Sequence, residues 1–101
     1  MKMPEHIVIS EGFRADLARA VQILKEAGCA EVFLFGSGAT GKIREQSDID
    51  LAIRGCPRGH FFHLLGRLLR ELKRPVDLVN LDTRDPFAQY LLQEGELLQV
   101  G

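Results

Sequence analysis

The sequence predicts a small α/β fold of the α+β type, in which a mixed sheet is flanked by helices. Helical and strand patterns alternate along the chain, and neither repeats nor low-complexity tracts interrupt them. A chain of 101 residues provides enough apolar surface for one core, but not for a second domain. We therefore expect residues 1–101 to fold as a single domain.

The first half of the chain contains one helix pattern and two strand patterns. A helix is expected to begin near Ser10, because the apolar residues that follow recur at helical spacing, and to end at Gly28. Residues 31–35 are nearly all apolar, which is typical of a central strand. Residues 48–53 predict a second strand after a polar stretch.

The next helix is predicted over residues 60–73 by apolar residues at helical spacing, and Pro75 ends it. Phe62 and Leu69 widen its apolar arc, so we expect cover on more than one side. Its basic side chains suit the docking of an acidic partner surface or RNA, or, more simply, they form the solvated face of the helix. This basic face comprises His60, His63, Arg67, Arg70 and Arg74.

The C-terminal part is predicted to add a strand, a helix and a short edge strand. Residues 76–81 form the strand pattern. Asp85 and Pro86 are a typical helix cap and first-turn residue, and Gly95 closes that helix. Residues 96–100 are expected to form the edge strand, and Tyr90 a packing residue with its hydroxyl at the rim.

Composition excludes several classes of protein. Thirteen Lys and Arg against fourteen Asp and Glu give a net charge of -1, which makes nucleic acid an unlikely direct ligand. No apolar run approaches the roughly 18 residues of a membrane span, and the N-terminus does not resemble a signal peptide. Cys29 and Cys56 are too few for a disulfide scaffold, so we expect two ordinary thiols in a cytoplasmic protein.

A glycine-rich turn follows the first predicted strand. Residues 36–41 match the pattern G-x-G-x-x-G, but a dinucleotide-binding fold needs a packed helix before the next strand. Residues 42–47 contain one large apolar side chain and cannot supply that helix. The turn can still hold phosphates, because its backbone N–H groups are accessible and Ser37 adds a hydroxyl. Taken alone, its glycines are more simply explained by a tight turn.

Three carboxylates occupy strand positions. Strand alternation places Asp48 and Asp50 on one face, about 6.5–7 Å apart at Cα, and Asp77 lies inside the apolar run of the third strand. A structural role would require cationic partners. Otherwise the three acids suit Mg²⁺ or Mn²⁺, and their mutual repulsion is expected to raise at least one pKa in the metal-free protein.

This combination resembles a known family. Gly36-Ser37, ten intervening residues, Asp48-x-Asp50 and the later Asp77 are similar to the DNA polymerase beta nucleotidyltransferase superfamily, in particular its minimal branch. Those short proteins are typically encoded beside a helical HEPN-type partner. They include antitoxins that transfer AMP from ATP to a tyrosine of that partner toxin. By motif, the resemblance covers residues 30–82.

The resemblance implies a role for each motif residue. It implies that Gly36 and Ser37 hold triphosphate oxygens, that Asp48 and Asp50 ligate the metal, and that Asp77 completes the site as ligand and possible base.

The sequence departs from the family at two positions. Many minimal members carry arginine where this chain has Gly38 and Thr40. Lys42 and Arg44 could take over their contacts to the nucleotide, or they could be solvated loop charges.

The expected function is therefore an Mg²⁺-dependent nucleotidyltransferase that uses ATP or another nucleoside triphosphate. A chain of this length has no room for an acceptor domain, so the expected acceptor is a separate protein of the HEPN type. The wide apolar arc of the predicted helix 60–73 also favours a hetero-complex or a homo-oligomer. The alternative is a non-catalytic subunit that binds a nucleotide or a partner protein.

Overall fold

The computed structural model describes residues 11–36 and 48–101, and its elements follow the predicted order closely. The elements are α1 (Glu11–Glu26), β1 (Glu31–Leu34), β2 (Ile49–Arg54), α3 (Phe61–Glu71), β3 (Val76–Asn80), α4 (Pro86–Glu94) and β4 (Leu98–Gln99). The predicted helix start at Ser10 lies outside the described residues.

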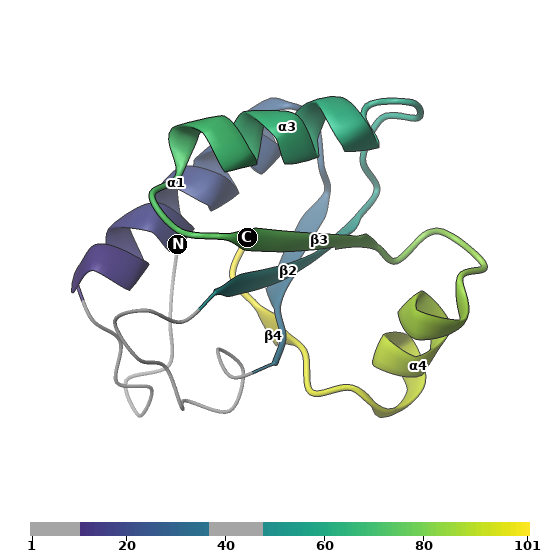
Figure 1. The fold of residues 1–101 in the computed structure, drawn as a ribbon. Helices are drawn as coiled ribbons and strands as arrows, with labels where there is room; N and C mark the ends of the chain where they lie inside the picture. Colours follow the sequence, from purple (N-terminus) through teal and green to yellow (C-terminus); the bar gives the residue numbers. More distant parts are fainter. Residues whose placement is uncertain (1–10, 37–47) are drawn as a thin grey trace.

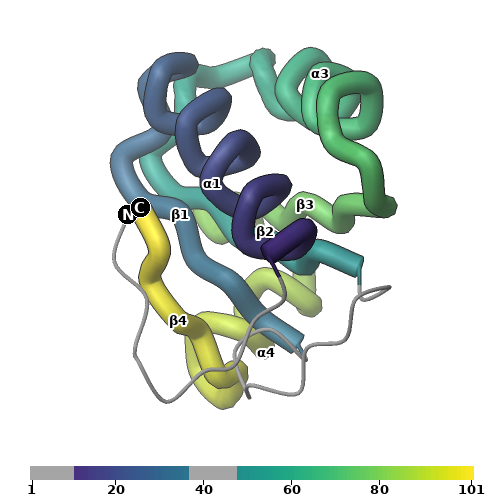
Figure 2. Tube along the Cα trace, turned by 90° about the vertical axis from the view of Figure 1, so that its left-hand side faces the viewer, coloured from purple at the N-terminus to yellow at the C-terminus, as the bar shows by residue number. Residues whose placement is uncertain are grey.

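The four strands form one mixed sheet in the order β3-β2-β1-β4. Strand β1 is antiparallel to both of its neighbours, whereas β2 and β3 run parallel and are connected through α3. Helices α1 and α3 lie on one side of the sheet, and α4 lies on the other (Figure 1). Figure 2 shows β4, the last strand of the chain, beside β1.

The side of the sheet that faces α1 and α3 carries the larger core. Ile49, Leu51 and Ile53 alternate along β2, and all three are fully buried here. They pack with apolar residues of α1 such as Phe13 and Leu24. The same alternation sends Asp50 to the α4 side of the sheet.

The side that faces α4 carries a smaller core of Phe35, Ala52, Leu81 and Leu91. Helix α4 begins as predicted, because the Asp85 carboxylate accepts the Phe87 N–H at 2.8 Å and Pro86 occupies the first turn.

The prediction of two free thiols is wrong. Cys29 and Cys56 form a disulfide that joins the turn before β1 to the loop after β2. The antiparallel pairing of β1 and β2 brings these segments together, and the Ala30 N–H donates to the Arg54 carbonyl at 3.0 Å beside the disulfide. No local pattern predicts this pairing, because it depends on the register of two strands.

The expectations for the α3 surface need two corrections. Phe62 is 82% exposed and Leu69 is 52% exposed, so no described residue covers the outer part of the apolar arc. Arg74 follows the helix and does not belong to its basic face, since it is largely buried and its guanidinium donates to the Asp16 carboxylate at 2.9 Å.

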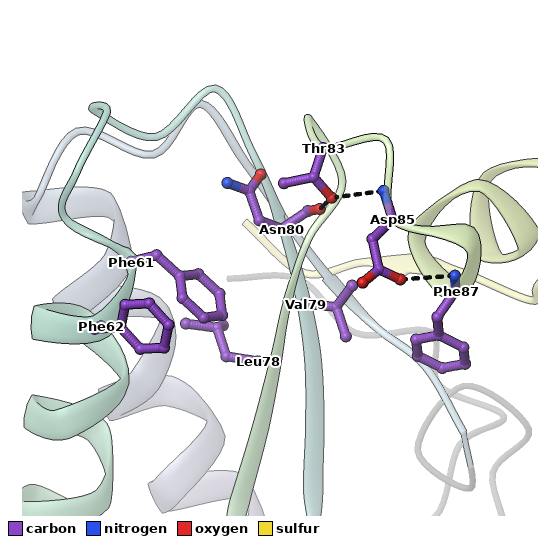
Figure 3. A pocket seen from close by; sticks show the side chains of 8 residues that line it. All are labelled: Phe61, Phe62, Leu78, Val79, Asn80, Thr83, Asp85 and Phe87. Atoms are coloured by element: carbon purple, nitrogen blue, oxygen red, sulfur yellow. Dashed lines mark hydrogen bonds between the residues drawn. The ribbon is translucent and has the colours of Figure 1, made fainter.

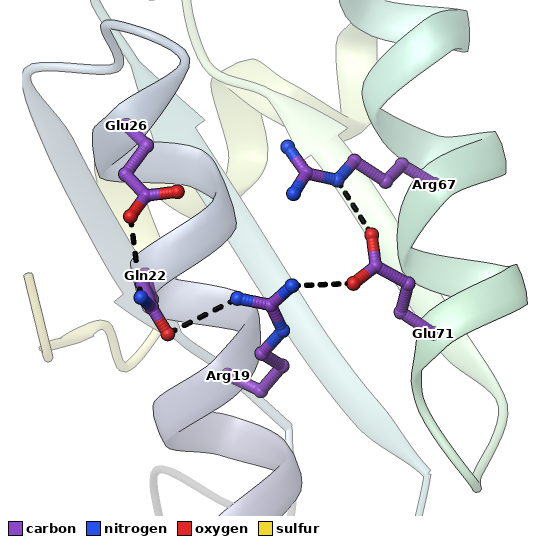
Figure 4. A network of polar contacts seen from close by, with 5 residues as sticks. All are labelled: Arg19, Gln22, Glu26, Arg67 and Glu71. Atoms are coloured by element: carbon purple, nitrogen blue, oxygen red, sulfur yellow. Dashed lines mark hydrogen bonds and ion pairs between the residues drawn. The ribbon is translucent and has the colours of Figure 1, made fainter.

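The solvated face of α3 carries a network of charges shared with α1 (Figure 4). Glu71 accepts hydrogen bonds from Arg67 and Arg19, and these bonds lower the pKa of the Glu71 carboxyl. Arg19 also contacts Gln22, which donates to Glu26. Because this network is exposed, it contributes little to stability.

No helix in the described part of the chain is long and apolar enough to cross a membrane.

Candidate active site

Two of the three predicted acids meet across the parallel pair of strands. The register of β2 and β3 places Asp50 directly opposite Asp77, on the side of the sheet that faces α4. Asp48 is exposed and directly precedes β2. Adjacent strands lie about 4.8 Å apart, so this register brings carboxylates from two strands into contact range.

The electrostatics of this pair differ from those of an ordinary surface carboxylate. The pKa of Asp50 is raised from 3.8 to about 6, most of all by burial, then by the charges of Asp77 and Asp48 and by a hydrogen bond with Asp77. Such a bond between two carboxyl groups requires a proton on one of them. The repulsion expected among the acids contributes to this shift, but burial is its largest cause.

Gly36 lies two residues after the end of β1, directly over Asp50. Its φ of +67° is a conformation that side chains rarely adopt, and a Cβ atom here would lie 2.6 Å from Asp50 Oδ2. The preceding residue, Phe35, donates its N–H to the Asp50 carbonyl at 2.9 Å. Position 36 therefore needs glycine for its backbone conformation and for the close approach to the carboxylate.

The remaining predicted ligands of the nucleotide lie outside the described residues. These are Ser37, Lys42 and Arg44, together with the departures at Gly38 and Thr40. Their roles stay predictions.

The donor chemistry of the acidic pair suits a hard cation. Carboxylate oxygens are the ligands that Mg²⁺ and Mn²⁺ prefer, and Asp50 and Asp77 supply them from rigid strand positions. Within residues 11–36 and 48–101, no three His, Cys, Asp or Glu side chains form a complete metal-binding group. A metal here would therefore need further oxygen ligands, such as those of a triphosphate.

Two cavities border α4, and the sequence predicted neither. One, of about 470 Å³, lies along β3 between the start of α3 and the start of α4 (Figure 3). Phe61 and Phe62 form one wall of this cavity, and Phe87 forms part of the other. The second, of about 520 Å³, lies between the end of β1 and α4, with Gly36 in its wall.

The second cavity contains two aromatic residues that the sequence does not identify as site residues. Tyr90, expected as a packing residue with its hydroxyl at the rim, is 53% exposed, and Phe87 is 48% exposed. Two aromatic residues three positions apart on a helix more often belong to a core, so their spacing carried no signal of a site.

Comparisons with known proteins agree with this geometry. The sequence model of a family described as polymerase beta, nucleotidyltransferase, matches residues 19–100. No curated protein matches the chain.

Several solved structures share the fold. A minimal nucleotidyltransferase superposes with a TM-score of 0.62 at 27% identity, covering 91% of this chain and 97% of the other. A toxin-antitoxin structure with AMP-PNP gives 0.59 at 24% identity, covering 79% and 69%. The toxin-antitoxin MntA-HepT gives 0.57 at 21% identity, covering 83% and 69%.

Proposed function

Because the chain belongs to the polymerase beta nucleotidyltransferase family, we propose that it transfers AMP from ATP to a hydroxyl group of a partner protein, as an antitoxin. The observation that carries this proposal is the position of Asp50, which contacts Asp77 on one side and lies beneath Gly36 on the other. A carboxylate pair below a glycine turn is suited to hold a metal-bound triphosphate.

The reaction is a displacement at the α-phosphorus of ATP. The acceptor oxygen forms a bond to phosphorus, the bond to the bridging oxygen of the β-phosphate breaks, and pyrophosphate leaves. Asp50 and Asp77, with Asp48 beside them and further oxygens from the triphosphate, would hold Mg²⁺ or Mn²⁺, which would neutralise phosphate charge. Asp77 lies at the exposed end of the carboxylate pair, where it can accept the proton of the incoming hydroxyl.

The turn at residues 36 and 37 is proposed to hold the triphosphate, and Lys42 and Arg44 to contact its oxygens. The requirement for glycine at position 36 supports this, because a side chain there would separate the turn from Asp50.

The proposed acceptor is a HEPN-type protein. Support comes from the toxin-antitoxin neighbours and from the exposed Phe62 and Leu69 on α3, which offer apolar surface for a partner or a second copy. The departures from arginine at Gly38 and Thr40 favour the second candidate, a subunit that binds nucleotide and partner without transfer.

Intact mass spectrometry tests the proposal. The product of the neighbouring gene is incubated with this protein, ATP and Mg²⁺, and its mass should increase by one or more AMP groups. Asp77→Asn should keep the fold and lower the transfer rate by about 10²–10⁴-fold, since it removes a base.

Glu26→Gln is the matched control, because it also neutralises one acid but lies on α1 within the charge network of Figure 4. It should leave the rate unchanged. If the partner binds but never gains mass, the non-catalytic candidate replaces the proposal. If transfer occurs at equal rates in the wild type and Asp77→Asn, Asp77 is not the base.

A further inference from the structure

The cavity between the end of β1 and α4 has no role in the chemistry described so far. Its volume of about 520 Å³ falls within the usual range for small-molecule sites. Its lining is aromatic toward the start of α4 and acidic toward the end of that helix. The lining includes Phe35, Gly36, Phe87, Tyr90, Glu94 and Glu96.

The aromatic side presents ring surface to solvent. The rings of Phe87 and Tyr90 are nearly parallel, with centroids 6.4 Å apart and planes 19° apart. Phe87 in turn meets the buried Phe35 edge-to-face at 5.9 Å, which anchors it to the smaller core. Phe87 and Tyr90 nevertheless remain about half exposed, so their ring surface is available to a planar ligand.

The cavity adjoins the carboxylate pair through one residue. Gly36 lies in the cavity wall, and a Cβ built on the same glycine would meet Asp50 Oδ2 at 2.6 Å. A ligand whose phosphates lie over Gly36 therefore has the aromatic cavity next to it. Nucleotides have this form, since a planar base is attached to the phosphates through one sugar.

The acidic side selects among planar ligands. Glu94 is the last residue of α4, and Glu96 lies two residues further along the chain. When ionised, their carboxylates accept hydrogen bonds but cannot donate them. They suit a base that presents an amino group, and they disfavour one that presents only a carbonyl at the same edge.

We propose that this cavity is the nucleobase subsite, in which an amino-bearing purine stacks on Tyr90 and Phe87 and donates to Glu94 or Glu96. This inference rests on the proposed function, because it assumes that a nucleoside triphosphate occupies the carboxylate site. It adds the structural source of the base preference.

The chain offers a built-in probe for the test. Tyr90 is its only tyrosine, and there is no tryptophan, so intrinsic fluorescence reports on this cavity alone. With Mg²⁺ present, ATP should quench this fluorescence, after correction for nucleotide absorption with free tyrosine. Inorganic tripolyphosphate, which has no base, should bind without quenching it.

Calorimetry separates stacking from phosphate binding. Tyr90→Ala should weaken ATP binding by roughly tenfold or more and leave tripolyphosphate binding unchanged. Tyr90→Phe keeps the ring and should restore the affinity for ATP. Gln93→Ala is the matched control, because it truncates an exposed side chain of the same helix that does not line the cavity, and it should change neither affinity.

Inosine triphosphate tests the acidic side, since a carbonyl replaces the amino group of adenine. Inosine triphosphate should bind the wild type more weakly than ATP does. In a Glu94→Gln, Glu96→Gln double variant, the two nucleotides should bind with equal affinity. Equal binding of the two nucleotides to the wild type would refute the carboxylate contact.

The inference and the proposed function fail in different ways. If ATP and tripolyphosphate both bind and Tyr90→Ala weakens neither, the base lies elsewhere and the inference alone is overturned. If neither ligand binds the wild type, both are overturned. If the base subsite behaves as expected but no partner gains AMP, the inference stands for a non-catalytic nucleotide-binding subunit.

Discussion

Asp16 and Asp50 lie on opposite sides of the sheet and have opposite surroundings. Asp16 belongs to the side of α1 and α3, where Arg74 donates to it at 2.9 Å and also lies over the Phe13 ring. Asp50 belongs to the side of α4, where its contact is a second acid, Asp77. In the part of the chain that the structure describes, no cation forms an ion pair with Asp50.

The difference shows what each side of the sheet does. A buried carboxylate that serves stability is matched with an opposite charge, because desolvation would otherwise oppose folding. The Asp50–Asp77 pair raises the free energy of the folded protein, and a bound cation would relieve that repulsion. The side of α1 and α3 therefore stabilises the fold, whereas the α4 side carries an arrangement suited to a ligand.

The largest expected effect comes from breaking the ion pair between Asp16 and Arg74. Arg74→Met leaves Asp16 buried without its cation, and we expect the free energy of unfolding to fall by about 3 kcal/mol. Urea unfolding near neutral pH measures this loss. Adding Asp16→Leu should recover part of it, since no unpaired charge then remains. A loss below about 1 kcal/mol would mean that the pair is as weak as an exposed one.

The disulfide also belongs to the side of α1 and α3, because Cys29 is part of the larger core. It links positions 27 residues apart, so reduction should lower the free energy of unfolding by about 3 kcal/mol through the entropy of the unfolded chain. Thermal unfolding with and without reductant measures this. The Cys29→Ser, Cys56→Ser variant should be insensitive to reductant. Titration of two free thiols in the non-reduced, folded protein would contradict the crosslink.

The smallest expected effect is a gain in the free energy of unfolding, on replacement of Asp50. The pKa of Asp50 is about 6 in the folded protein against 3.8 ordinarily, so ionisation of Asp50 disfavours the folded state. Stability should fall as pH rises from about 4 to 6, because the folded protein binds more protons there than the unfolded chain. Asp50→Asn should therefore raise the free energy of unfolding at pH 7 by about 1–2 kcal/mol, after allowance for solvent screening.

Urea unfolding of both proteins at several pH values checks this prediction in the absence of divalent metal. The gain from Asp50→Asn should vanish only below about pH 3, where the wild-type carboxyl is protonated in the folded and in the unfolded state. A variant that is less stable than the wild type at pH 7 would show that the Asp50 charge is compensated after all.

The sequence predicted the acidic pair because two regular rules sufficed. Alternation fixed the face of Asp50, and the apolar run around Asp77 identified a neighbouring strand. The disulfide was beyond such rules, since it depends on which loops the antiparallel pairing of β1 and β2 brings together. Phe62 illustrates a further limit, because a helical pattern shows which side chains share a face but not which of them have neighbours.

The position of β4 has a consequence for the order of folding. Strand β1 pairs with β2, which follows it closely in the chain, and with the two-residue β4, which arrives only after α3, β3 and α4. Closing that long loop is entropically unfavourable, and the pairing that compensates it is short, even with the backbone hydrogen bonds that join Val100 and Gly101 to Val32. We therefore expect the segment of α4 and β4 to dock last and to open first, so that its amides exchange with solvent before those of β1 and β2. The aromatic wall beside Gly36 would then belong to the part of the molecule that opens most readily.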